Sequence, residues 1–154
     1  MTLSETIRLV EVIASHQPSI RMIVQNDIYR LNFAPSAKYG VFGWLQDQHS
    51  GSVRSGMNQF SFTFFYIDRL TDDQSNQIEI QSVGFETLSN IIRELDERGL
   101  SVDQFTYQAF NQKFLDECAG GFARVTLEVP ADLPCAEVFA DYAEEDFSDD
   151  FLIY

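Results

Sequence analysis

The sequence contains few of the residues on which several common kinds of site depend. It has two cysteines, Cys118 and Cys135, and two histidines, His16 and His49, among 154 residues. Two cysteines cannot form a disulfide framework, and these four residues lack the spacing of zinc ligands. A catalytic cysteine would need a nearby histidine, and Cys118 lies beside acidic residues instead.

Long hydrophobic runs and basic residues are scarce as well. No apolar stretch approaches the ~18 residues that cross a bilayer, and the first residues have neither a basic segment nor an apolar core typical of a secretory signal. The sequence has 10 Lys and Arg residues and 24 Asp and Glu residues, which gives a net charge of −14. Because proteins bind nucleic acid largely through basic contacts to phosphate, we expect no sequence-specific nucleic-acid partner. Without long apolar runs we expect no membrane partner, and the two cysteines are compatible with the cytoplasmic location that we expect.

The acidic residues are concentrated towards the C-terminal end. Residues 131–154 hold eight Asp and Glu and no Lys or Arg, whereas residues 1–130 have a net charge of −6. We therefore predict one domain over residues 1–130 and an acidic arm over 131–154. The arm also contains aromatic residues, which a purely solvating tail lacks, so we expect it to dock on its own domain or on a neighbour. A partly disordered tail is the alternative.

Two helices are predicted. Thr2 and Glu5 form a capping-box pattern ahead of apolar residues at helical spacing, and Pro18 ends that pattern, which indicates a helix over about residues 3–16. A second helix of roughly 23 residues should open at the acidic stretch 72–76 and end near Arg98 and Gly99. Its apolar stripe comprises Val83, Phe85, Leu88, Ile91, Ile92 and Leu95.

Four strands are predicted from alternating or aromatic segments. They cover residues 39–45, 60–67, 105–109 and 123–129, while residues 20–24 are ambiguous and 47–56 indicate a flexible loop. This order, αββαββ, predicts an α+β fold with a four-stranded, mainly antiparallel sheet and two helices on one face. Phe65, Ile67 and either Trp44 or Phe42 would then lie on a sheet face without a covering layer, which favours contact with a partner.

The motifs that support catalysis or metal binding are missing. Residues 72–83 resemble a calcium-binding loop at their start, but Gln77 stands where that loop needs glycine and Val83 where it needs glutamate. The sequence has no phosphate-binding glycine loop and no nucleophile elbow. We therefore predict a protein that is not an enzyme and has no catalytic residue, metal or cofactor.

Five segments of the sequence resemble segments of a known group of proteins. In order along the chain they are Asn26–Asn32, Tyr39–Trp44, Phe64–Asn76, Ile80–Ser82 and Phe114–Gly120. Through these segments, residues 1–130 resemble small structural proteins encoded in tailed-phage and prophage morphogenesis clusters. The layout is similar to that of the tail-terminator or tail-completion group of head–tail joining proteins. The resemblance implies a subunit that forms a ring, commonly a hexamer, contacts neighbouring tail or connector proteins and becomes a virion component.

Such a subunit needs two different complementary surfaces, because head-to-tail contacts close a ring. We expect the segment 47–57 to reach across to a neighbour and the acidic arm to meet exposed arginines. The residues predicted at these contacts are Trp44, His49, Arg54, Phe65, Ile67, Arg69, Phe147, Phe151 and Tyr154. Two alternatives remain open: an acidic binding or inhibitor module that mimics DNA, and a small-ligand carrier.

Overall fold

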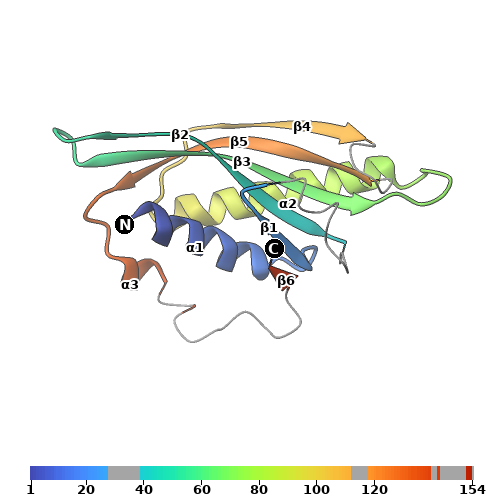
Figure 1. Ribbon diagram of the computed structural model, residues 1–154, viewed down its shortest axis with the longest axis horizontal. Helices are drawn as coiled ribbons and strands as arrows, with labels where there is room; N and C mark the ends of the chain where they lie inside the picture. Colours follow the sequence, from blue (N-terminus) through green and yellow to red (C-terminus); the bar gives the residue numbers. More distant parts are fainter. Residues whose placement is uncertain (28–38, 112–117, 140–141, 143–151, 154) are drawn as a thin grey trace.

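The fold is a mixed β-sheet with its helices on one face (Figure 1). The computed structural model describes residues 1–27, 39–111, 118–139, 142 and 152–153. Along the chain the elements are α1 (Leu3–Ser15), β1 (Met22–Gln25), β2 (Val41–Ser52), β3 (Met57–Arg69), α2 (Gln77–Glu97), β4 (Phe105–Asn111), β5 (Cys118–Pro130), α3 (Cys135–Val138) and β6 (Leu152–Ile153). The strand order across the sheet is β4-β5-β3-β2-β1-β6.

The α+β class is confirmed, but the sheet differs from the predicted four antiparallel strands. β2, β3, β5 and β4 pair antiparallel, whereas β1 pairs parallel with β2, and β6 pairs parallel with β1. The residues of β1 are buried from both sides, since Ile23 belongs to one hydrophobic cluster and Met22 and Val24 belong to another. A strand buried on both faces has no polar alternation, so the sequence pattern left it ambiguous.

Helix α1 begins as the capping box predicts. The Thr2 hydroxyl accepts a hydrogen bond from the Glu5 backbone N–H at 3.2 Å, and the Glu5 carboxylate accepts one from the Thr2 N–H at 2.6 Å. Hydrogen bonding of the Glu5 carboxyl group to the Thr2 backbone N–H and to the Thr2 side chain lowers the pKa of this carboxyl group. Helix α1 buries Leu9, Val10 and Ile13 against the sheet.

Helix α2 ends at the predicted place, and Leu88, Ile91, Ile92 and Leu95 of its predicted stripe are buried, whereas Phe85 is exposed. Gly99 has a φ of +94° just beyond the helix, as expected for a glycine that ends a helix. Gly84 faces the sheet, where an added Cβ would lie 2.9 Å from the Tyr107 hydroxyl and 3.1 Å from the Tyr66 ring. The next residue, Phe85, therefore lies at the side of the contact and is 47% exposed.

The sheet has an apolar cluster on each face. The larger cluster joins the helices to Phe62, Phe64 and Tyr66 of β3. The prediction that Phe65 and Ile67 lie on an uncovered face is wrong, because these side chains are 1% and 0% exposed and belong to the second cluster. That cluster also contains Met22, Val24, Val41, Phe110 and Cys118, with Tyr39, Leu45 and Phe122 packed against it.

Candidate interaction surfaces

The most prominent surface feature is the hairpin of β2 and β3. Figure 1 shows that it extends well beyond the ends of α1 and α2. Residues 47–52, predicted as part of a flexible loop, continue β2, and pairing with β3 runs to Ser52 and Met57 with a register shift between Gln46 and His49. The loop is thus shortened to a tight turn, and Gly56 has a φ of +65° there.

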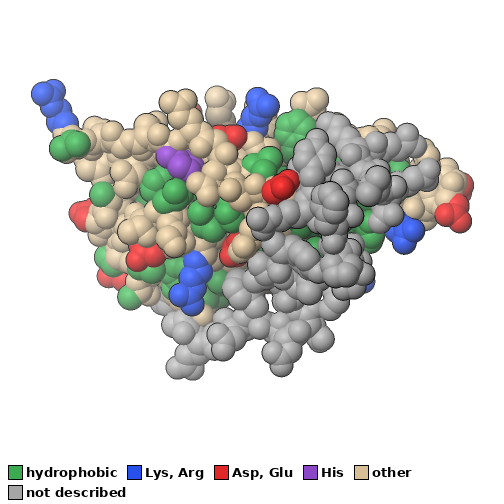
Figure 2. Space-filling view, in the orientation of Figure 1, with side chains coloured by type: hydrophobic (Ala, Val, Ile, Leu, Met, Phe, Trp, Pro, Cys, Tyr) green, Lys and Arg blue, Asp and Glu red, His purple; other side chains and the backbone are tan. Residues whose placement is uncertain are grey.

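The tip of this hairpin exposes one apolar and one basic side chain. Val53 is fully exposed, and Arg54 is exposed beside it. Figure 2 shows a basic side chain projecting at the end of the molecule where Figure 1 places the tip. The end of β5 supports the base of the turn, because the Ala131 N–H donates to the Gly56 carbonyl at 2.9 Å. The strands therefore hold the tip away from the helices.

His49 lies on the hairpin at the helix-side face of the sheet. Its ring packs against Phe60 and Phe62, with centroids 5.6 Å away in both cases. Its Nδ1 accepts a hydrogen bond from the Ser61 N–H at 3.3 Å. These contacts give His49 a packing role within one copy, and its edge remains partly exposed.

Three of the predicted contact residues are buried within the chain. Phe65 and Ile67 lie in the second cluster, and Trp44 is 5% exposed in the first. The Trp44 indole Nε1–H donates to the Glu11 carboxylate at 2.9 Å, and the Gln25 amide donates to the same oxygen at 2.7 Å. In this fold the three side chains stabilise the chain itself and present no surface to a partner.

Arg69 lies at the end of β3 and is exposed. Its guanidinium carbon lies 5.9 Å from the centre of the Tyr39 ring. Phe147, Phe151 and Tyr154 lie outside the described residues. Of the nine predicted contact residues, Arg54 and Arg69 are therefore the two that the structure describes as exposed.

Part of the acidic arm packs on the domain itself. The arm contains the short helix α3, whose Val138 is 5% exposed within the larger cluster, and Phe139 and Tyr142 pack against that cluster. The Met1 ammonium group donates to the carbonyls of Ala131 and Leu133 at 3.0 and 3.1 Å. These contacts attach the start of the arm to the beginning of α1.

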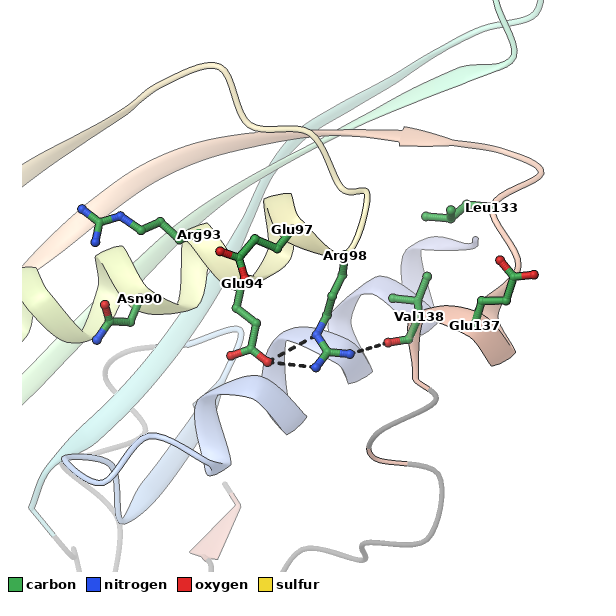
Figure 3. A pocket seen from close by; sticks show the side chains of 8 residues that line it. All are labelled: Asn90, Arg93, Glu94, Glu97, Arg98, Leu133, Glu137 and Val138. Atoms are coloured by element: carbon green, nitrogen blue, oxygen red, sulfur yellow. Dashed lines mark hydrogen bonds and ion pairs between the residues drawn. The ribbon is translucent and has the colours of Figure 1, made fainter.

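A pocket of about 670 Å³ lies between α2 and α3 (Figure 3). Its walls carry Asn90, Arg93, Glu94, Glu97, Arg98, Leu133, Glu137 and Val138. The Arg98 guanidinium donates to the Glu94 carboxylate at 3.0 and 3.3 Å and to the Val138 carbonyl at 2.7 Å. In Figure 3 the bond from Arg98 to the Val138 carbonyl connects the end of α2 to α3 at one side of the pocket, whereas the bonds from Arg98 to Glu94 lie along α2.

Tyr142 completes this connection. Its hydroxyl donates to the Glu94 carboxylate, its ring lies 4.4 Å from the Arg98 guanidinium carbon, and its centroid is 4.7 Å from that of His16. Burial and the adjacent Glu94 raise the pKa of Tyr142 to about 12. The polar groups here are engaged with one another, so the cluster fastens the arm. The spacing of Glu94 and Arg98, four residues apart on a helix, is the sequence signal that indicates this ion pair.

A second hollow, of about 440 Å³, lies on the opposite face of the sheet among polar side chains. Asp47 accepts a hydrogen bond from the Thr63 hydroxyl at 2.9 Å, and Ser61 and Thr126 share one at 2.9 Å. Arg124 lies in the same hollow. Within the described ranges, no three His, Cys, Asp or Glu side chains are grouped closely enough to hold a metal ion.

Comparisons with known proteins leave the relationship open. No protein-family model matches the chain, and no curated protein matches it. No helix among the described residues is both long and apolar enough to span a membrane.

Proposed function

We propose that the protein is a non-enzymatic assembly subunit, of the tail-terminator or tail-completion type that its sequence resembles. In this proposal it acts through contacts with other copies of itself and with neighbouring tail or connector proteins. The observation that supports this best is the projecting β2–β3 hairpin. It is a stiff element, held in register by strand pairing, that carries exposed Val53 and Arg54 away from the rest of the chain.

The charge of the molecule suits this role. A cationic tip on a chain of net charge −14 is attracted to the acidic surface of a second copy, and the exposed valine adds apolar contact. The tip and the surface it meets are different, so the contact is head-to-tail and can close into a ring. An acidic lumen would also repel the phosphates of passing DNA.

Native mass spectrometry of the purified full chain tests this proposal. We expect a closed oligomer larger than a dimer, which Arg54→Glu weakens at least about tenfold, because the variant places like charge against an acidic surface. Arg93→Glu is the matched control, with the same charge change at an exposed position on α2. Failure to form any species larger than a dimer, or equal assembly of both variants, would refute the proposal.

The acidic binding module predicts a different result in a mixing experiment. A basic nuclease would then form a stoichiometric complex with the monomer at moderate salt, and the hairpin tip would be dispensable. The assembly subunit predicts no such complex.

A further inference from the structure

Two carboxylates in the pocket between α2 and α3 have no partner among the described residues. Glu94 is already engaged, since it accepts from the Arg98 guanidinium at 3.0 Å and from the Tyr142 hydroxyl. Glu97 and Glu137 also line the pocket and are exposed, and neither forms an ion pair or a hydrogen bond within the part of the chain that the structure describes. The pocket thus keeps two negative charges that can bind a cation.

The arginines of the pocket do not cancel these charges. Three glutamates and two arginines line it, which leaves a net charge of −1. Arg98 is paired with Glu94, so these two residues together are neutral. Arg93 is the other cation of the lining, and Figure 3 shows its side chain directed away from α3 and from Glu137. The side of the pocket next to α3 is therefore acidic.

The same pocket also has an apolar part. Leu133, in the segment that leads into α3, is partly exposed and packs against the larger cluster. Val138 of α3 contributes to the same lining. The volume of about 670 Å³ lies within the range of roughly 300–1,000 Å³ that ligand pockets have, so the pocket has room for two side chains. A group that fits this pocket combines a cation with an apolar side chain.

The tip of the β2–β3 hairpin has this combination. The structure describes three large hydrophobic side chains as exposed, namely Val53, Ile78 and Phe85. Of these three, only Val53 is next to an arginine in the sequence, and that residue, Arg54, forms no ion pair or hydrogen bond with any described residue. The turn is held by its own backbone, since the Gly56 N–H donates to the Ser52 carbonyl at 2.9 Å. A turn that is fixed in this way loses little conformational freedom on binding.

The hairpin of one copy cannot place its tip in the pocket of the same copy. Figure 1 shows the tip well apart from α3, beyond the ends of the helices. Strand pairing holds β2 and β3 in register up to Ser52 and Met57, and the Ala131 N–H donates to the Gly56 carbonyl at the base of the turn. The pocket is therefore open to the tip of another copy.

We propose that the pocket of one copy receives the hairpin tip of a second copy. Arg54 then binds the two glutamates that have no partner, and Val53 contacts Leu133 and Val138. Hydrogen bonds between a guanidinium and carboxylates are stronger than neutral ones, and added salt should weaken this contact. Each copy offers both a tip and a pocket, so the contact can repeat around a ring. It presupposes the assembly role proposed above and identifies the acidic surface that the tip meets.

Sedimentation velocity of charge-exchange variants of the full chain tests this contact. Glu137→Arg places a cation opposite Arg54, and we expect the dissociation constant between neighbouring copies to rise at least about tenfold. Glu79→Arg is the matched control, since it makes the same change at an exposed position of α2 roughly 27 Å along the helix from Glu97, and it should change the constant less than about twofold. Arg93→Glu adds a carboxylate to the pocket and should leave assembly at least as tight as in wild type.

A double variant measures the pairing itself. Arg54→Glu combined with Glu137→Arg exchanges the two charges and should restore assembly to within about threefold of wild type. Arg54→Glu combined with Glu79→Arg has the same overall charge and should stay as weak as Arg54→Glu alone. The three positions are exposed, so the variants should fold.

Cross-linking locates the contact directly. Arg54→Lys keeps the positive charge, and a carbodiimide joins a lysine amine to a carboxylate that touches it. Mass spectrometry of the cross-linked oligomers should find residue 54 of one copy joined to Glu97 or Glu137 of another.

Three results would overturn this contact and leave the proposed function standing. They are a Glu137→Arg chain that assembles like wild type, a charge exchange that fails to restore Arg54→Glu, and cross-links from residue 54 to other carboxylates alone. In each case the tip would meet a different surface. A wild-type chain that forms nothing larger than a dimer, or an Arg54→Glu chain whose larger oligomers stay intact, would overturn both proposals.

Discussion

Two phenylalanines, one buried and one exposed, provide a matched pair that tests whether the second cluster is a core. Phe65 is 1% exposed, and its ring fills the space beside Gly43, where an added Cβ would lie 2.1 Å from that ring. Phe65→Ala should therefore lose the transfer free energy of a buried ring and leave a cavity, which costs about 3–5 kcal/mol. Phe85 is 47% exposed, so Phe85→Ala should cost about 1 kcal/mol.

Urea denaturation measures both values, with the fluorescence of the single tryptophan, Trp44, as the signal. A loss of about 3–5 kcal/mol is a large part of the stability of a typical domain, so the Phe65→Ala midpoint should fall markedly. Equal losses of stability, or a Phe65→Ala loss below about 1 kcal/mol, would show that the second cluster is not a core.

Further predictions concern backbone packing, pH and the arm. Gly120→Ala should destabilise the chain by about 3 kcal/mol in the same denaturation assay, because the added Cβ would lie 1.9 Å from a backbone carbonyl oxygen of β3. Gly56→Ala has open space around it but a φ of +65°, so it should cost about 1–2 kcal/mol. Equal losses of stability in the two variants would contradict the strand register. Burial raises the pKa of Tyr107 to about 12, and burial with Glu94 raises that of Tyr142 to about 12. These folded-state pKa values exceed the usual tyrosine pKa near 10, so the two neutral hydroxyl groups stabilise the fold fully below pH 10, and this stabilisation is lost as the pH rises from about 10 to 12. Circular dichroism along an alkaline titration would detect the loss of folded structure, and a flat profile would refute the prediction. Tyr142→Phe keeps the ring on Arg98 but removes the hydrogen bond to Glu94, so limited proteolysis should cleave the arm faster than in wild type, and an unchanged rate would show that this bond does not fasten the arm.

Local signals in the sequence predicted a large part of the fold. The capping box at Thr2 and Glu5 fixed the start of α1, and Gly99 marked the end of α2. The alternation over residues 60–67 identified the centre of β3. Each of these signals acts within one element, through hydrogen bonds or through the side on which a side chain lies.

Features that depend on distant parts of the chain were missed. The parallel pairing of β1 has no local signal, because both faces of that strand are buried. Residues 47–52 are polar and contain a glycine, yet pairing with β3 keeps them in a strand. Phe85 matched the helical stripe, but the neighbouring Gly84 is the residue that approaches Tyr66 closely, and Phe85 lies exposed beside this contact. The buried position of Phe65 depends on which side chains the fold brings over it.

If this chain works through contacts between copies of itself, the purified full chain should assemble at high protein concentration. Electron microscopy should then show closed, symmetric particles in which the hairpin tip of each copy contacts the next copy. A field of isolated single chains at every concentration and salt condition would contradict it.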